Sequence, residues 1–147
     1  MKTNNQDPVP CLPILSFLAQ EQSRVEAARG QLRQRWPSLQ LTDRHFPFDE
    51  TDYYRDEMGD SLHRWWGYRE TLANPADLVE WKKTCEDIEE QFQDDASNRT
   101  VNIDPGYLNY GLVVLGSHKP HHQKIYLGDG VYADPVLEYV EGSYRSF

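Results

Sequence analysis

The sequence lacks the features of several large protein classes. Its 147 residues include only two cysteines, Cys11 and Cys85, which lie far apart in apolar patterns, so neither a disulfide framework nor a CxxC metal site is indicated. No stretch approaches the roughly 20 apolar residues of a membrane span. The longest unbroken apolar run is residues 112–115. These absences argue against a disulfide-rich secreted protein and against a membrane protein.

Positive charge is also scarce. The chain has 15 Lys and Arg against 24 Asp and Glu, a net charge of −9, which repels a phosphate backbone unless the cations are segregated. The most basic segment, residues 21–35, carries four arginines and two glutamates. Nucleic-acid binding is therefore disfavoured. Asp7 and nearby prolines interrupt the apolar stretch that a signal peptide would need, so we expect a cytoplasmic protein.

The length and composition suit one self-sufficient domain. A domain of about 150 residues buries about 68–70 % of the surface of its unfolded chain. Aromatic residues make up 12 % of the sequence, with 4 Trp and 9 Tyr, and they supply large apolar bodies that disordered chains usually lack. No linker or repeat divides the chain. We expect a flexible N-terminus over residues 1–8 and a single α+β domain over residues 9–147.

Hydrophobic periodicity predicts strands and helices in the first two thirds of the chain. The run over residues 14–19 fits a buried strand, and residues 20–36 fit a helix that ends at Pro37. Alternating patterns predict strands over residues 39–46 and 62–72. Asn74 and Pro75 predict the start of a second helix. Its apolar stripe is Leu78, Trp81, Cys85, Ile88 and Phe92, with Glu86, Asp87, Glu89 and Glu90 on the solvent side.

The last third predicts shorter elements. A strand over residues 99–103 is expected to break at residues 104–106, and residues 107–115 fit a short helix, although Val113 and Val114 favour a strand. Two hairpins follow, with turns at residues 128–130 and 141–142. This order predicts an α+β fold: a split βαβ (ferredoxin-like) sandwich with two helices on a mainly antiparallel sheet, and a C-terminal short helix and β-hairpin extension.

Acidic residues are concentrated in residues 43–60, where seven acids accompany two arginines. Carboxylates this close raise one another's pKa or recruit a hard cation such as Mg²⁺ or Ca²⁺. The spacing does not match a Ca²⁺-binding loop, and a solvated acidic turn anchored by Phe46 and Phe48 is the alternative. A divalent cation is the one cofactor that the sequence suggests, and none is established. Its candidate ligands are Asp49, Asp52 and Asp104.

Two further segments combine turns with polar chemistry. Residues 102–107 lead toward the expected short helix, whose free N–H groups could bind an anion or be capped by Asp104. Residues 125–133 predict a Gly-Asp-Gly hairpin in which Tyr126 and Tyr132 could meet one ligand, with a simple hairpin tip as the alternative. The histidines at positions 118, 121 and 122 precede this hairpin, and their spacing matches no zinc signature.

These segments together resemble one known family. The motifs are FPFDETDYYRDEMG over residues 46–59, NIDPGY over residues 102–107 with Arg99 before it, and IYLGDGVYA over residues 125–133. In this joint pattern, which spans nearly the whole chain, the sequence resembles a family of small bacterial proteins, domain-of-unknown-function family 4416. The resemblance implies a single-domain bacterial protein without an established activity. Some relatives carry a GTP-binding description, for which this sequence has no nucleotide motif.

Three functions remain open. The favoured one is a module that binds a small molecule or a partner protein in a recess lined by acids and tyrosines, because no catalytic pairing can be built from the spacing. The alternatives are a metal-dependent (Mg/Mn-type) small-molecule enzyme and a nucleotide-binding regulator, the latter resting on the resemblance alone. The candidate ligand-binding residues are Arg69, Asn102, Tyr107, Tyr126, Asp129 and Tyr132, and a candidate aromatic patch is Tyr53, Tyr54, Trp65 and Trp66.

Overall fold

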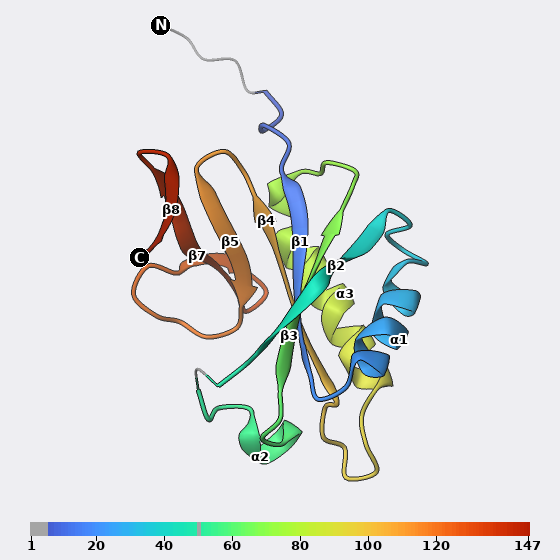
Figure 1. Ribbon diagram of the computed structural model, residues 1–147. Helices are drawn as coiled ribbons and strands as arrows, with labels where there is room; N and C mark the ends of the chain where they lie inside the picture. Colours follow the sequence, from blue (N-terminus) through green and yellow to red (C-terminus); the bar gives the residue numbers. More distant parts are fainter. Residues whose placement is uncertain (1–5, 50) are drawn as a thin grey trace, which may run out of the picture.

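One antiparallel sheet of eight strands organises the chain (Figure 1). The structure, a computed structural model, describes residues 6–49 and 51–147, so most of the expected flexible segment 1–8 lies outside the described residues, as does position 50 of the acidic segment. The sheet order is β2-β3-β1-β4-β5-β7-β6, and β8 pairs with β7. The elements are β1 (Leu12–Ala19), α1 (Gln22–Leu32), β2 (Leu39–Pro47), α2 (Arg55–Met58), β3 (His63–Arg69), a 3₁₀ turn (Pro75–Asp77), α3 (Leu78–Gln91), β4 (Val101–Leu108), β5 (Leu112–Ser117), β6 (Ile125–Gly128), β7 (Val131–Val140) and β8 (Ser143–Ser146).

The expected fold class is wrong. Instead of a two-helix ferredoxin-like sandwich with a short extension, five strands, β4 to β8, follow α3 and continue the sheet formed by the first three. The predicted short helix over residues 107–115 does not form, because these residues belong to β4, β5 and the turn between them. Val113 and Val114 are buried in β5, where β-branched side chains pack well on a pleated surface.

The predicted break at residues 104–106 is also wrong, because β4 runs through it. Pro105 pairs with Leu15 of β1, and the pairing of β4 with β5 is confined to residues 106–108 of β4. Proline is tolerated at this position because no β5 partner needs its missing N–H. Gly106 is required by close packing, since a Cβ there would lie 2.0 Å from the carbonyl oxygen of Val114. The three residues therefore shape the strand and do not end it.

The other predicted elements are confirmed, with ends shifted by a few residues. These are the strands over residues 14–19, 39–46 and 62–72, both helices and both hairpins. Asn74 begins the second helical segment as predicted, since its Oδ1 accepts a 2.9 Å hydrogen bond from the N–H of Ala76. One helical face differs from the prediction. Glu89, expected on the solvent side, is only 4 % exposed.

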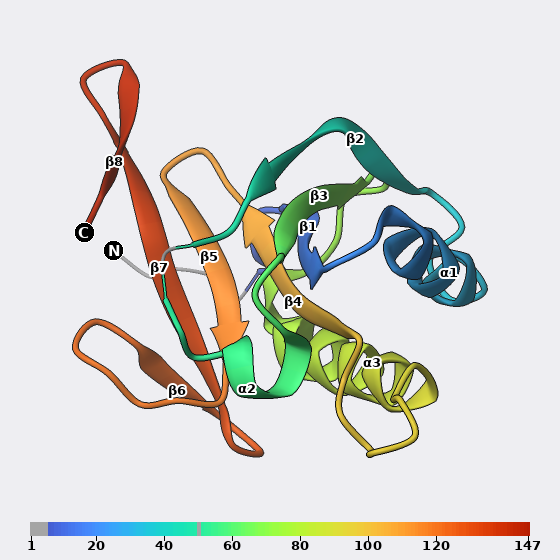
Figure 2. The same ribbon diagram turned by 60° about the horizontal axis from the view of Figure 1, so that its bottom comes forward.

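Apolar side chains cover both faces of β1. On one face Leu15 and Phe17 pack against α1 and α3, which lie together on that side of the sheet (Figures 1 and 2). On the opposite face Leu18 packs with Phe48, Met58 and Leu62 from the connection between β2 and β3. This second, smaller core fixes α2 on the face opposite the two longer helices. The residues just before α2 are thereby positioned near the middle of the sheet.

The described residues include no helix that is both long and apolar enough to cross a membrane.

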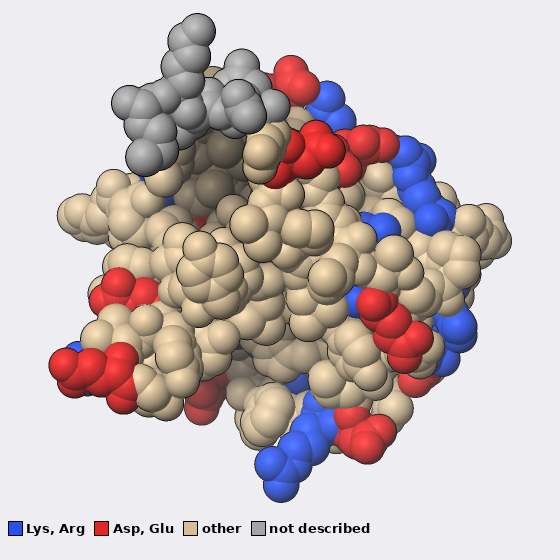
Figure 3. All heavy atoms as spheres, turned by 90° about the horizontal axis from the view of Figure 1, so that it is seen from above, with Lys and Arg blue, Asp and Glu red and all other residues tan. Residues whose placement is uncertain are grey.

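Seen from above, one face of the molecule carries its Lys, Arg, Asp and Glu side chains mainly around the edge, and its centre is uncharged (Figure 3). Tyr110, in the turn between β4 and β5, is 84 % exposed. The surface therefore separates a weakly charged face from the charged rim around it.

Candidate functional site

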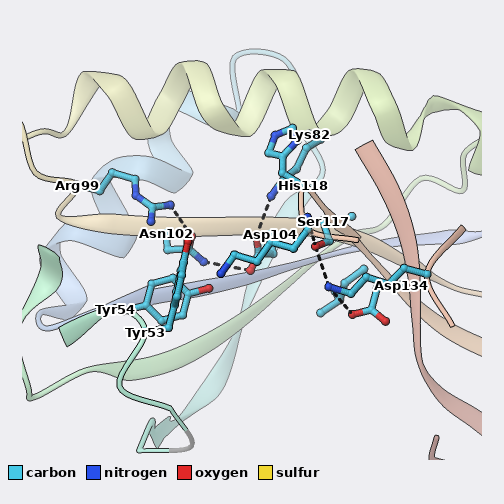
Figure 4. Close-up of a pocket in the computed structure, with 13 residues that line it drawn as sticks. Tyr53, Tyr54, Lys82, Arg99, Asn102, Asp104, Ser117, His118 and Asp134 are labelled. Atoms are coloured by element: carbon cyan, nitrogen blue, oxygen red, sulfur yellow. Dashed lines mark hydrogen bonds and ion pairs between the residues drawn. The ribbon is translucent and has the colours of Figure 1, made fainter. Parts of the chain in front are cut away.

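A polar cavity lies where β4 and β5 diverge. Their pairing ends at Gly106 and Leu115, and beyond this point the two strands line a recess of about 290 Å³ (Figure 4). The recess also draws on α3, on the segment before α2 and on the connection between β5 and β6. Its lining residues are Tyr53, Tyr54, Lys82, Arg99, Asn102, Asp104, Leu115, Gly116, Ser117, His118, Lys119, Lys124 and Asp134.

The inner wall of the recess is formed by Lys82, Arg99, Asn102 and Asp104. Lys82 points from α3 toward β4 (Figure 4), and its Nζ donates a 2.9 Å hydrogen bond to Oδ1 of Asp104. The Nδ2 of Asn102 donates to the other carboxylate oxygen at 3.1 Å. Burial opposes the charge on Lys82, but the adjacent carboxylate outweighs it, so the pKa of Lys82 lies above its ordinary value. Lys82 and Asp104 therefore form a partly buried ion pair, with the lysine the more buried partner.

Arg99 extends this wall with three further partners. Its guanidinium donates to both oxygens of Glu57 at 2.8–3.1 Å, to Glu89 at 2.8 Å and to Oδ1 of Asn102 at 2.7 Å. The hydrogen bonds from Arg99 lower the pKa of Glu57. Burial raises the pKa of Glu89 to about 7, although Arg99 partly offsets the effect. Neither glutamate lines the recess, so the carboxylates that neutralise Arg99 lie behind the wall.

Tyrosine rings and a lysine form one side of the mouth. We define the mouth as Tyr53, Tyr54, Ser117, Lys119 and Lys124. The ammonium nitrogen of Lys119 lies 2.9 Å from the ring centre of Tyr53, and this ring meets Tyr54 edge to face at 4.9 Å. Burial raises the pKa of Tyr54 to about 12, so its phenol keeps its proton at neutral pH and can donate a hydrogen bond.

The other side of the mouth is built around Ser117. The Nζ of Lys124 donates to Oγ of Ser117 at 3.1 Å and lies 3.9 Å from a carboxylate oxygen of Asp134. His118 beside them contacts acceptors with both ring nitrogens: the carbonyl of Gly130 at 2.8 Å and the carboxylate of Glu86. These two contacts raise the pKa of His118. The imidazole is therefore held in a form that favours positive charge.

The recess has the opposite charge balance to the chain. Four cations line it, Lys82, Arg99, Lys119 and Lys124, against the two carboxylates of Asp104 and Asp134. The whole chain carries −9. Cations from separate elements that face one recess attract anions and supply charge-assisted hydrogen bonds. The arrangement can therefore bind a carboxylate or a phosphate group next to a tyrosine surface.

The predicted metal ligands are not brought together. Asp49 and Asp52 line a small pocket beside α2, where Asp52 pairs with Arg55 at 2.9 Å. Asp104 lies in the recess and pairs with Lys82. Throughout residues 6–49 and 51–147, no three His, Cys, Asp or Glu side chains form a group that could hold a metal ion. The helix start expected after Asp104 is absent as well, because the residue lies within β4.

Of the predicted ligand-binding residues, Asn102 lines the recess. Arg69 lies on the helix side, with its guanidinium carbon 5.0 Å from the ring centre of Trp36, and Tyr107 packs against the core of that side. Tyr126, Asp129 and Tyr132, the predicted residues of the β6–β7 hairpin, do not line the recess either. Asp129 accepts a 2.9 Å hydrogen bond from Lys83, and the rings of Tyr126 and Tyr132 contact each other with centroids 5.1 Å apart.

The four predicted patch aromatics do not form one surface. Trp65 is 4 % exposed and packs in the helix-side core, whereas Trp66 follows it in β3 and faces the other side of the sheet. Tyr53 and Tyr54 line the mouth of the recess. The aromatic residues are thus divided between core packing and the cavity.

Sequence reasoning missed most of the cations of the recess. Lys82 had one usable signal, because it lies within the apolar stripe of α3, four residues after Leu78 and three before Cys85. Lys119 and Lys124 stand in a polar connection that looks like an ordinary solvent-exposed loop. Nothing in the local sequence indicates that this connection returns to the split between β4 and β5.

Comparison with known proteins identifies one similarity. The model of a family described as a domain of unknown function (DUF4416) matches residues 10–147. No curated protein and no solved structure matches the chain.

Proposed function

We propose that this chain, which belongs to the DUF4416 family, is a binding module for a small anionic molecule, held in the recess between β4 and β5. The observation that carries the proposal is the positive charge at the mouth. With Lys82 paired to Asp104 and Arg99 to Glu57 and Glu89, the lining still holds Lys119 and Lys124 against the one carboxylate of Asp134, in a chain of net charge −9. A concave site with a few convergent polar groups is the usual form of a small-molecule site. The ligand class is a carboxylate or phosphate ester.

The mouth supplies the groups that would contact the anion. Lys119 contacts the Tyr53 ring and Lys124 contacts Ser117, so both ammonium groups retain N–H donors for a ligand. The inner wall, in contrast, already satisfies Lys82 with Asp104. We therefore place the anionic group of the ligand at Lys119 and Lys124, with the hydroxyl of Ser117 as a further contact.

The phenol rings indicate what adjoins the anionic group. Tyr53 is 57 % exposed and Tyr54 is half-buried, so the pair offers an accessible aromatic surface beside the lysines. A planar ring on the ligand can pack against this surface and gain about 0.5–1.5 kcal/mol. The preferred ligand is an anion that carries a ring or a similar apolar group.

The experiment is a titration followed by ¹H–¹⁵N NMR with inorganic phosphate and with phenyl phosphate. We expect saturable shifts in the amides of Tyr53, Tyr54 and residues 117–124. Phenyl phosphate should bind about threefold to tenfold more tightly than phosphate because of ring packing. Binding should weaken at high ionic strength, since exposed charges are screened.

Two variants separate specific binding from general attraction. The double variant Lys119→Ala/Lys124→Ala should bind phenyl phosphate at least about tenfold more weakly, because it loses two charge-assisted contacts. Lys83→Ala is the matched control, as Lys83 is exposed and pairs with Asp129 outside the recess. Equal losses in both variants, or shifts spread over the surface without saturation, would contradict the proposal.

A further inference from the structure

Two histidines contact each other on the β2–β3 pair, outside the recess. The Nδ1 atoms of His45 and His63 lie 3.2 Å apart, and the two rings meet edge to face at an angle of 65°. In the pairing of β2 with β3, His45 is opposite Trp65 and His63 is opposite Pro47. The two imidazoles are therefore diagonal neighbours on one face of the sheet.

This face is the helix side of the sheet, whereas the recess opens on the other. His63 pairs with Ala19 of β1, which belongs to the core beneath the helices. Asp104 of the recess pairs with Ser16, an odd number of residues from Ala19, and so faces the opposite side. The histidine pair is thus a separate feature from the anion site.

The backbone and a tryptophan hold the pair in place. The register of β2 against β3 shifts between Leu41 and His45, and such irregularities re-aim side chains at functional positions. The ring of His45 stacks on Trp65 with centroids 5.0 Å apart and an angle of 24°. Because Trp65 is buried, the stack restricts the imidazole while His45 itself stays exposed to solvent.

We propose that His45 and His63 bind a divalent transition-metal ion through their Nδ1 atoms. Two metal–nitrogen bonds of about 2.0–2.1 Å that meet at roughly 100° separate the two nitrogens by about 3.2 Å. The observed separation of the Nδ1 atoms is 3.2 Å. The spacing of the two nitrogens therefore matches that of two ligands of one ion.

The ligand chemistry selects the class of metal. Imidazole nitrogen suits Cu²⁺, Ni²⁺ and Zn²⁺, whereas Mg²⁺ and Ca²⁺ prefer oxygen. Within the part of the chain that the structure describes, no third His, Cys, Asp or Glu completes the set. The remaining coordination positions would be occupied by water, which leaves an open site with the affinity order Cu²⁺ above Zn²⁺.

The experiment titrates untagged protein with CuCl₂ and, separately, with ZnCl₂, and follows tryptophan fluorescence and heat. We expect one Cu²⁺ per chain, quenching of the Trp65 emission by the adjacent ion, and weaker binding of Zn²⁺. The variant Trp65→Phe should keep the binding heat and lose most of the quenching. Electron paramagnetic resonance of the Cu²⁺ complex should show coupling to two nitrogens.

Single substitutions decide whether the pair is the site. His45→Gln and His63→Gln should each weaken Cu²⁺ binding at least about tenfold, because one ligand is lost. The matched control is His122→Gln, since His121 and His122 also form a contacting ring pair with centroids 4.1 Å apart. Circular dichroism checks that the variants fold. If His63→Gln does not fold, His45→Gln alone tests the proposal, because His45 is exposed to solvent. Unchanged binding in His45→Gln, or an equal loss in His122→Gln, would overturn the proposal.

Discussion

The inner wall and the mouth of the recess both contain cationic side chains, but these side chains have different roles in the two regions. In the inner wall Arg99 contacts Glu57, Glu89 and Asn102, and Lys82 contacts Asp104. In the mouth Lys119 contacts an aromatic ring, and Lys124 contacts a hydroxyl and lies 3.9 Å from its nearest carboxylate oxygen. Cations that are saturated within the protein hold the structure together, and cations that keep free donors are available to a ligand.

Burial explains why the loss of a charged partner should lower stability more in the inner wall than in the mouth. The side chain of Glu89 is 6 % exposed and that of Lys82 is 8 % exposed, so an unpaired charge in the inner wall would lack both a partner and water. Side chains at the mouth can exchange a protein contact for water at little cost. The comparison therefore predicts large losses of stability from the inner wall and small ones from the mouth.

The largest effect is expected from Arg99→Met. The substitution removes the cation that pairs with Glu57 and Glu89 and the donor that bonds Oδ1 of Asn102, so the free energy of unfolding at neutral pH should fall by about 3–5 kcal/mol. Urea denaturation followed by circular dichroism measures the change. Arg35→Met is the matched control, because Arg35 pairs with Glu80 at 2.9 Å but both side chains are more than half exposed. That control should lose no more than about 1 kcal/mol. Similar losses in both variants would show that burial does not separate the two kinds of pair.

The helix face shows how far the sequence could anticipate the inner wall. The predicted stripe is confirmed at Leu78, Trp81, Cys85 and Ile88, which are buried in α3. Its last member, Phe92, lies just beyond the helix end and packs against the core partly buried. Lys82 and Glu89 border that stripe at a spacing of seven residues, which places them on one side of the helix. The charge of Glu89 suggested a solvent position, and only the tertiary partner Arg99 makes its burial tolerable. A charged pair at this spacing beside an apolar stripe is the signal that was present.

The path of β4 and its separation from β5 could not be predicted from local sequence patterns. Asp104-Pro105-Gly106 has the composition of a turn, yet β1 on one side keeps these residues extended. The expected meeting of three segments occurs only in part, since the tyrosines before α2 and the NID segment reach the recess while the Gly-Asp-Gly hairpin does not. Where two strands separate depends on long-range pairing, and no spacing within one segment encodes it.

A pH experiment sharpens the comparison within the inner wall. The pKa of Glu89 is raised from 4.5 to about 7, so between these values the folded chain holds a proton that the unfolded chain releases. This group therefore lowers stability as pH rises from 4.5 to 7, by up to about 3 kcal/mol. The variant Glu89→Gln cannot ionise and keeps an oxygen acceptor for Arg99. Its stability relative to the natural chain should rise across this range and level off above it.

The measurement is the free energy of unfolding in urea at pH 5 and at pH 8 for both proteins. The lowered pKa of Glu57 and the raised pKa of His118 also contribute to the pH dependence. Both groups remain in the variant, so the difference between the two proteins reports Glu89 together with its coupling to Glu57 through Arg99. A variant that is less stable than the natural chain at pH 8 would mean that the charged Glu89–Arg99 pair is net stabilising.

The smallest effect is expected at the mouth, from Lys119→Ala. The substitution removes an exposed contact between an ammonium group and the Tyr53 ring, which is worth about 0.5–1 kcal/mol at most. Because no buried charge is left behind, urea denaturation should show a midpoint close to that of the natural chain and an unchanged slope. The same variant should weaken phenyl phosphate binding, since the proposed site places the anionic group of the ligand at this ammonium group. A loss of stability as large as that of Arg99→Met would make Lys119 a structural residue and remove the distinction between wall and mouth.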